Sequence, residues 1–373
     1  MEQSKYRDFV IEKMGLAGIT INGLQPWDLQ VKDDRFYERV LRDGSLGLGE
    51  SYMAGWIDSS QFDEFVHRIL ISGIDKIKPN GFKDYWIGLQ AIVQNLQSKK
   101  RSLEVGKKHY DIGNDLFRAM LDKRMSYSCA YWKNAKNLNE AQEAKLDLVC
   151  RKIGLKPGMK VLDIGCGWGS FAKFAAEKYQ ARVVGITISQ RQLDLAKELC
   201  KGYPIELRFQ DYRDVSENFD HIVSIGQMEH VGYKNYRQYM ETVHRCLNDE
   251  GLFLLHTIGS NTSEFRGDPW LEKYIFPNGM LPSISQIAVA SENLFVMEDW
   301  HNFGAYYDQT LMAWHHNFVK SWDFLRAQYG TEFYRMWNYY LLSLAGLFRA
   351  RRVQLWQIVF SKRGVKGGYN SVR

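Results

Sequence analysis

From about residue 155 onwards, short β-branched runs alternate with amphipathic helical segments, and this alternation constrains the fold more than any other feature of the chain. It is typical of βαβ units and a parallel sheet. Seven strands in this order predict a doubly wound α/β sheet. The predicted strands are residues 160–165, 181–187, 205–210, 220–225, 251–258, 294–300 and 353–361.

Two parts of the chain depart from this alternation. Residues 1–97 contain short helical stretches and predict a separate, smaller, mainly helical N-terminal domain, with residues 98–373 as the second domain. The SLGLGES glycines at 45–51 lack the GKS/T ending of a phosphate loop, and we predict that they serve turns and close helix packing. A long helical insertion is predicted before the last strand. Its apolar stripe would share one helix face, in a core or along a groove or tunnel: Leu311, Trp314, Phe318, Trp322 and Leu325.

The first predicted strand leads into a glycine-rich turn, VLDIGCGWGS. Gly165, Gly167 and Gly169 let the backbone turn sharply and approach a ligand with no Cβ in the way. Asp163 precedes them, so the spacing is D-x-G-x-G-x-G rather than the G-x-G-x-x-G of dinucleotide sites. The motif resembles the first motif of class I S-adenosylmethionine-dependent methyltransferases. That resemblance implies a Rossmann-like fold in which this loop holds the methionine part of the cofactor.

The segment after the second strand, ITISQRQ, also favours S-adenosylmethionine over a nicotinamide cofactor. Dehydrogenases commonly carry an acidic residue there to bind a ribose. Thr187, Ser189 and Gln192 supply only neutral hydrogen-bonding groups. Asp211, after the third strand, stands where many such methyltransferases contact the adenine.

Positive charge is unevenly spread along the chain, whose formal net charge is +6. Residues 333–373 contain no Asp or Glu but eight basic residues, and a second basic cluster comprises Lys99, Lys100, Arg101, Lys107 and Lys108. Basic patches attract nucleic acid or anionic lipid headgroups, and a merely solvated face is equally compatible with the composition. The N/D-P-P-Y/F motif of nucleic-acid amino methylation is absent, so we expect no nucleic-acid partner.

Targeting features are also absent from the sequence. No apolar run approaches the ~20 residues that span a bilayer, and the charged first residues contain no signal-peptide core. Five cysteines, without a CxxC pair, indicate neither a disulfide framework nor a zinc site. We therefore expect a cytoplasmic protein with no bound metal.

Several longer blocks together carry a more specific resemblance, which runs from about residue 20 to the C-terminus. They are GSLGLGESYMAGW, VGKKHYDIGNDLF, MSYSCAYW, LDIGCGWGS, GITISQRQ, QMEHVG, LLHTIG, YIFPNG and MEDWHNFGAYYDQTLMAW. These blocks closely resemble the cyclopropane-fatty-acyl-phospholipid synthases. The resemblance implies transfer of a methyl group from S-adenosylmethionine to the cis double bond of a phospholipid acyl chain, followed by ring closure. It also implies a homodimer at the inner membrane surface, whose N-terminal domain serves lipid docking and dimerisation and whose basic patches contact anionic headgroups.

Site residues carry over from the same resemblance. Its anion site, which binds bicarbonate as the proton acceptor, maps onto Cys129, Glu229, His256, Ile258 and Tyr307. Ile258 can offer only its backbone, and without the resemblance His256 would be interpreted as a core histidine. The cofactor positions are Tyr127 and Ser128 in the closing segment, Asp163, Gly165, Gly167 and Gly169 in the loop, Thr187, Ser189 and Gln192 on the ribose side, and Asp211 and Tyr212 on the adenine side.

The chemistry implied by the resemblance makes its own demands on the site. An alkene that attacks a sulfonium methyl leaves a carbocation, which aromatic faces stabilise. Candidate lining residues, for which core packing is the alternative, are Trp270, Tyr274, Phe303, Tyr307 and Tyr340. A thiolate beside the cation would be alkylated, so we predict that Cys129 is not a nucleophile. Leu344 replaces a cysteine that relatives often carry, which argues against a mechanism that needs a thiol there.

Two alternatives remain open from the sequence. The same cation could yield a methyl-branched or methylene acyl chain instead of a ring. The chain could also be a lipid-binding or regulatory module with a degenerate cofactor site, although intact glycines and a complete set of anion residues argue against this.

Overall fold

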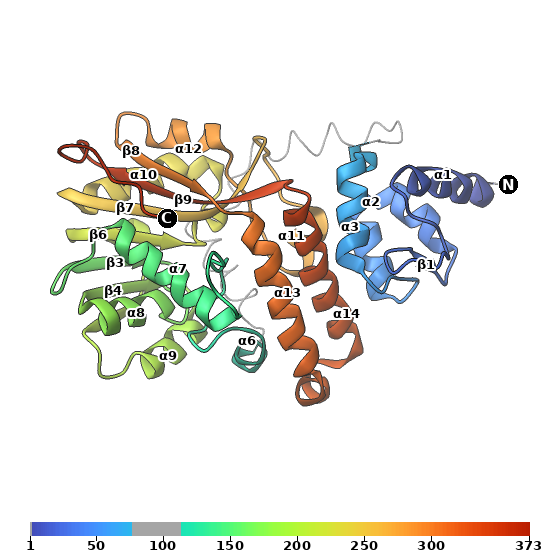
Figure 1. Cartoon of the computed structure of the whole chain (residues 1–373), viewed down its shortest axis with the longest axis horizontal. Coiled ribbons are helices and arrows are strands. Elements are labelled where there is room, and N and C mark those ends of the chain that lie inside the picture. Colours follow the sequence, from blue (N-terminus) through green and yellow to red (C-terminus); the bar gives the residue numbers. More distant parts are fainter. Residues whose placement is uncertain (1, 77–112) are drawn as a thin grey trace. The chain divides into compact units, whose positions relative to one another are not determined.

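The computed structural model of the chain describes residues 2–76 and 113–373 (Figure 1). Contacts divide it into two compact units. The first unit contains the described residues up to 76 together with Gly267–Pro277 and Tyr307–Arg352; the second contains those from 113 to Arg266, with Asn278–Tyr306 and Val353–Arg373. The predicted boundary after residue 97 and the basic cluster at 99–108 lie outside the described residues, so both stay predictions.

The second unit is built on one seven-stranded sheet with the order β5-β4-β3-β6-β7-β9-β8. Its strands are β3 (Lys160–Ile164), β4 (Arg182–Thr187), β5 (Ile205–Phe209), β6 (Phe219–Ile225), β7 (Leu247–Ser260), β8 (Val296–Asn302) and β9 (Val353–Ser361). Neighbouring strands from β5 to β7 are parallel, whereas β9 runs antiparallel to both β7 and β8. All seven predicted strands are confirmed, and the last one makes the sheet mixed rather than fully parallel.

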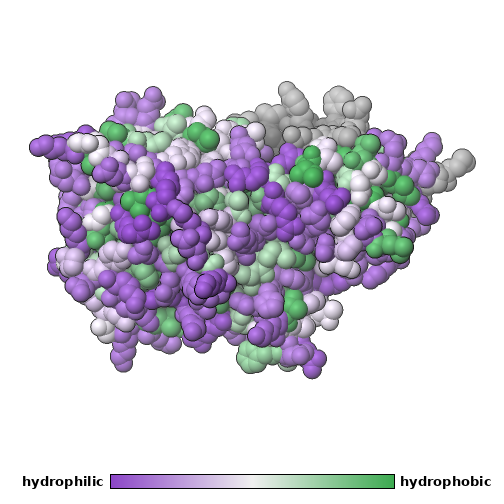
Figure 2. All heavy atoms as spheres, in the orientation of Figure 1, coloured by the Kyte–Doolittle hydropathy of each residue, from purple (hydrophilic) through white to green (hydrophobic). Residues whose placement is uncertain are grey.

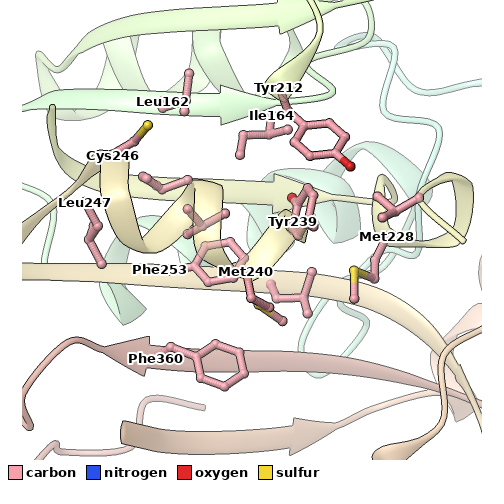
Figure 3. Close-up of a cluster of buried hydrophobic side chains, with 14 of the residues drawn as sticks. Leu162, Ile164, Tyr212, Met228, Tyr239, Met240, Cys246, Leu247, Phe253 and Phe360 are labelled. Atoms are coloured by element: carbon pink, nitrogen blue, oxygen red, sulfur yellow. The ribbon is translucent and has the colours of Figure 1, made fainter. Parts of the chain in front are cut away.

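Side chains that alternate along the strands form two buried clusters on opposite faces of this sheet. Leu162 and Ile164 of β3 belong to one cluster, which also receives side chains from α10 (Figure 3). Side chains of α12 belong to the same cluster. Val161 belongs to the other, against α7 and α8. The sheet is therefore doubly wound, as predicted. The helices of this unit are α6 (Asn114–Met120), α7 (Leu138–Lys152), α8 (Ser170–Tyr179), α9 (Gln190–Leu199), α10 (Tyr236–Cys246) and α12 (Ile284–Ser291), with 3-10 turns η2 (Tyr212–Asp214), η3 (Met228–His230) and η4 (Tyr233–Asn235).

The first unit is mainly helical. Its helices are α1 (Glu2–Leu16), α2 (Arg35–Met53), α3 (Phe62–Ser72), α11 (Pro269–Tyr274), α13 (Ala305–Lys320) and α14 (Trp322–Arg349), with the 3-10 turn η1 (Ile74–Lys76) and the short strands β1 (Gln30–Val31) and β2 (Ile57–Asp58). In the SLGLGES stretch, a Cβ at Gly47 would collide with the Arg39 carbonyl and one at Gly49 with the Trp270 ring, so the predicted role in close packing is confirmed. Both glycines lie within α2, and the bend of that helix is at Gly44, just before the stretch, at φ 56°.

The prediction that five apolar residues share one helix face is wrong. Leu311, Trp314 and Phe318 are buried on α13, which ends at Lys320. Ser321 leaves helical geometry, with ψ near 1°, and a new helix starts after it. The remaining two stripe residues therefore belong to α14, although the Trp322 ring still packs 5.5 Å from that of Phe318.

Hydrophilic side chains cover most of the face seen in Figure 2, with hydrophobic ones scattered among them. Within the described ranges, no helix combines the length and the apolar character that crossing a membrane requires. All five cysteines lie in the described part of the chain, where each is buried and none forms a disulfide.

Candidate functional site

The glycine loop joins the end of β3 to the start of α8. Gly165, Gly167 and Gly169 all have positive φ, at 79°, 54° and 80°, which favours glycine. The backbone N–H groups of Gly165 and Cys166 each donate to the Ile186 carbonyl at 3.0 Å, which fixes the loop to β4. A Cβ placed at Gly167 would meet no atom within 4 Å. The loop is thus pinned on one side and open on the other, as close approach of a ligand requires.

Asp163 lies beneath this loop in a buried position. Its Oδ2 atom has no hydrogen-bond partner. Burial raises the pKa of this carboxyl to about 7, and the nearby Lys145 ammonium partly opposes the rise. A buried acceptor without a partner costs about 1–3 kcal/mol, so a donor from a bound ligand would stabilise this arrangement.

The residues predicted for the ribose side are hydrogen-bonded to one another. Ser189 caps α9 by accepting from the Gln192 backbone N–H at 3.3 Å. The Thr187 hydroxyl accepts from the Ser189 backbone at 3.2 Å and donates to the Gln192 side chain at 3.3 Å. All three are buried. They form one neutral, preorganised group of polar side chains after β4.

The predicted adenine side follows β5. Asp211 caps η2 by accepting from the Arg213 backbone and also forms an ion pair with the Arg213 side chain, both at 3.0 Å. The Tyr212 ring packs edge-on against Tyr239 at 4.9 Å within the hydrophobic cluster, as Figure 3 shows. Burial raises the pKa of Tyr212 to about 12. Tyr212 is therefore neutral and anchored in the core at the position where the adenine is predicted.

Glu229 of η3 is the buried carboxyl predicted for the anion site. Its Oε1 atom accepts from the Ile258 backbone N–H at 2.7 Å, whereas Oε2 has no hydrogen-bond partner. Burial raises the pKa of Glu229 to about 7. The Ile258 backbone N–H thus fixes one oxygen of Glu229. Near neutral pH the carboxyl is partly protonated and can donate a hydrogen bond from its second oxygen.

His256 of β7 is also buried and only half paired. The Gln357 amide donates to Nδ1 at 3.2 Å, which assigns the ring proton to Nε2, and Nε2 has no hydrogen-bond partner. Burial, and after it Lys145, lowers the pKa of His256 well below its ordinary value, so the ring is neutral. A satisfied core histidine would have both nitrogens paired. His256 instead presents a buried N–H donor.

Cys129 and its neighbours are the third group of residues predicted for the site. The Cys129 thiol is fully buried and donates to the Ala130 carbonyl at 3.3 Å. Tyr127 packs edge-on against Phe117 at 5.1 Å. The Ser128 hydroxyl accepts from Lys145 Nζ at 2.8 Å. The non-nucleophilic role of Cys129 stays a prediction.

Lys145 and Gln142 of α7 were not among the predicted site residues. The Gln142 side chain donates to the carbonyl oxygens of Ser126 and Ser128 at 3.3 and 2.8 Å. The sequence carried a signal for both residues. They occupy positions one helical turn apart on the face that also carries the buried Leu146, and a polar side chain on an apolar face requires a partner.

The aromatic candidates are divided between the two units. In the first unit, Tyr307 packs against Phe348 at 4.5 Å and Trp314 at 5.9 Å. In the second, Phe303 lies edge-on to His256 at 5.9 Å. The first unit also contains Trp270, Tyr274 and Tyr340, each against another aromatic ring. Each of these side chains thus packs against a ring of its own unit.

Comparison with known proteins decides the family. Residues 97–358 match the mycolic acid cyclopropane synthetase family. The chain is 55% identical, over 97% of its length and 94% of the relative's, to the cyclopropane-fatty-acyl-phospholipid synthase of Escherichia coli K12. It belongs to the cyclopropane synthase family. Cyclopropane mycolic acid synthase 2 of Mycobacterium leprae is 36% identical, over 70% of this chain and 95% of that one.

Solved structures agree with this membership in the cyclopropane synthase family. A cyclopropane synthase from Mycobacterium tuberculosis matches with a TM-score of 0.66 and 30% identity, over 70% of this chain and 98% of its own. A mycolic acid cyclopropane synthase solved with SAH and CTAB matches with the same TM-score and 33% identity, over 70% and 98%. The protein is therefore an S-adenosylmethionine-dependent cyclopropane synthase with the class I methyltransferase fold, which confirms the predicted family, fold class and enzyme class.

Proposed function

We propose that the protein transfers a methylene carbon from S-adenosylmethionine to the cis double bond of an unsaturated acyl chain in a membrane phospholipid, with bicarbonate as the proton acceptor. The observation that carries this proposal is the pair of buried, half-paired groups on Glu229 and His256. Each is fixed through one atom and has a second polar atom without a partner. Because such atoms are costly when buried, a small anion that accepts from both would stabilise the site.

The proposed reaction has two steps, and the cation formed between them must be kept from water. The alkene carbon bonds to the sulfonium methyl, the carbon–sulfur bond breaks and SAH leaves. The resulting carbocation then loses a proton from the transferred carbon as the ring closes. Burial of Cys129, Glu229 and His256 keeps water from trapping the cation.

When bound, bicarbonate would be the base that accepts the lost proton. The protonated Glu229 carboxyl, which is about half of the population near pH 7, and the neutral His256 ring would donate to it. In these donor forms neither side chain is the base. Cys129 and Tyr307 complete the predicted set by resemblance. The cofactor would be held by the open glycine loop, with Asp163 as the buried acceptor beneath it.

The test uses the purified protein, S-adenosylmethionine with a labelled methyl group, and liposomes of unsaturated phospholipid. We expect labelled acyl chains that have gained one methylene carbon as a ring and have no double bond. Buffer freed of carbon dioxide should lower the rate, and added bicarbonate should restore it. No such product from folded protein would refute the proposed reaction, and a bicarbonate-independent rate would refute the proposed base.

A second product is favoured by one relative. The chain is 33% identical to a probable fatty acid methyltransferase of Pseudomonas putida, over 73% of this chain and 72% of that one. If the same cation lost a proton from a neighbouring chain carbon instead of closing the ring, it would give a methyl-branched acyl chain that still has a double bond. Mass spectrometry of the product, with localisation of any double bond, separates this outcome from the ring.

We further propose that the enzyme is a cytoplasmic homodimer that binds the inner membrane peripherally, with residues 1–97 in lipid docking and dimerisation. The basic C-terminal segment contributes less free charge than its composition suggests. Arg349 pairs with Asp63, Glu64 and Asp308, and Arg373 pairs with Asp299. Salt-dependent sedimentation with anionic liposomes tests docking, and the mass in solution by light scattering tests the dimer.

A further inference from the structure

Two buried polar side chains on α7 have no role in the reaction described above. Lys145 is 1% exposed and Gln142 is fully buried. Burying an ammonium costs several kcal/mol unless it is paired, and well-packed apolar replacements are often at least as stable. The partners of Lys145 therefore indicate what its charge does in this position.

The direct partners of both side chains lie in the segment that the sequence assigns to cofactor closure. Lys145 Nζ donates to the Ser128 hydroxyl at 2.8 Å, and Gln142 donates to the Ser128 carbonyl, also at 2.8 Å. Asp122 accepts from the Ser126 backbone at 2.8 Å and fixes the start of the same segment. Ser128 is thus held by its side chain and its backbone, between Tyr127 and Cys129.

The Lys145 charge also faces the other elements of the site. It interacts electrostatically with Asp122, Cys129 and Asp163, and it is one of the charges acting on His256. Burial lowers the pKa of Lys145 to about 8, so the amine is still mostly protonated near neutral pH. One buried cation therefore connects the closing segment, the acid of the glycine motif and the predicted anion pocket.

We propose that Lys145 is a positioning residue for cofactor binding: its ammonium fixes Ser128, and through it the segment 127–129. This inference rests on the proposed function, because it takes that segment as part of the S-adenosylmethionine site. It assigns Lys145 no contact with the reacting carbons.

A double-mutant cycle on Lys145→Met and Ser128→Ala tests the proposal. Methionine keeps the length and apolar stem of lysine, so the variant should fold, and thermal unfolding checks this. SAH affinity by calorimetry needs no turnover. We expect each single variant to weaken SAH binding about tenfold, in the range of a charge-assisted hydrogen bond, and the double variant to bind within about twofold of Lys145→Met, because the two groups act as one pair.

Two further variants sharpen the result. Lys145→Arg keeps the charge and should recover part of the lost affinity. Lys152→Met is the matched control, since Lys152 is an equally buried lysine of α7 that contacts Asp299 at 3.4 Å and the His301 ring at 3.1 Å. Lys152 also contributes to lowering the pKa of His256, so this control is used only for SAH affinity. The SAH affinity of Lys152→Met should stay within about twofold of wild type.

Three outcomes would overturn the proposal. They are additive losses in the cycle, wild-type SAH affinity in folded Lys145→Met, and an equal loss in Lys152→Met. Failure of the proposed function is distinguishable, because wild-type protein would then bind SAH and yet make no cyclopropane acyl product from phospholipid liposomes.

Discussion

Glu229→Gln probes the consequence of placing a carboxyl in a buried site. The amide keeps an oxygen that can accept from the Ile258 N–H and replaces the unpaired oxygen with a donor. The folded pKa of Glu229 is about 7 against an ordinary value of 4.5. The folded state therefore binds more protons than the unfolded state between these values, and wild-type stability falls as pH rises through this window.

The magnitude follows from the same two pKa values. At about 1.4 kcal/mol for each tenfold change in an equilibrium constant, an ionised Glu229 destabilises the folded state by about 3 kcal/mol well above pH 7. Glutamine cannot ionise. The free energy of unfolding of Glu229→Gln, relative to wild type, should therefore rise by about 2–3 kcal/mol between about pH 5 and pH 9, and most of the rise should be complete near pH 7.

Urea denaturation of both proteins at a series of pH values measures this difference. Glu241→Gln is the control, because Glu241 is half exposed in an i,i+4 pair with Arg237, and its effect should stay within about 0.5 kcal/mol at every pH. A difference between Glu229→Gln and wild type that does not change with pH would refute the view that Glu229 is a protonatable, desolvated carboxyl.

Two further predictions concern the site directly. Cys129→Ser should keep measurable turnover but reach it at a different bicarbonate concentration, which a bicarbonate titration of the rate measures; near-complete loss of turnover would instead indicate a nucleophile. Gly167→Ala should lower the free energy of unfolding by about 1 kcal/mol, because the φ of Gly167 is positive. The added methyl group meets no protein atom but would project toward the predicted cofactor, so SAH binding should weaken by more than this cost explains. Equal effects on unfolding and on SAH binding would show that the loop does not approach the cofactor.

The sheet was predictable from the sequence because its signal is local. β-branched runs such as that of β3 are buried on both faces, and alternate residues enter two separate clusters. The break at Ser321 was not predictable from apolar spacing. Phe318, Trp322 and Leu325 keep helical spacing across it, and only the backbone at Ser321 shows that one helix ends and another begins.

The candidate site was predictable in part. The glycine motif could be recognised from its spacing, and Glu229 and His256 were predicted from the resemblance to the family. The resemblance placed Ile258 and Glu229 in one site, and that Ile258 offers only its backbone could be anticipated. The hydrogen bond between these two residues, which are 29 positions apart along the chain, could not. Lys145 was missed although its position on the buried face of α7 was a signal, because a lysine on a helix usually has a solvated ammonium. Only the fold identifies Ser128 as its partner.

The central claim is ring formation on a phospholipid acyl chain, and deuterium labelling of the transferred methyl group tests it most directly. The protein would be incubated with S-adenosylmethionine carrying a fully deuterated methyl group and with liposomes of monounsaturated phospholipid, and the acyl chains would be analysed by mass spectrometry. The account predicts chains that keep two of the three deuterons, at a single ring carbon, and have no double bond. Chains that keep all three deuterons as a methyl branch, or that lose one and retain a double bond, would contradict it.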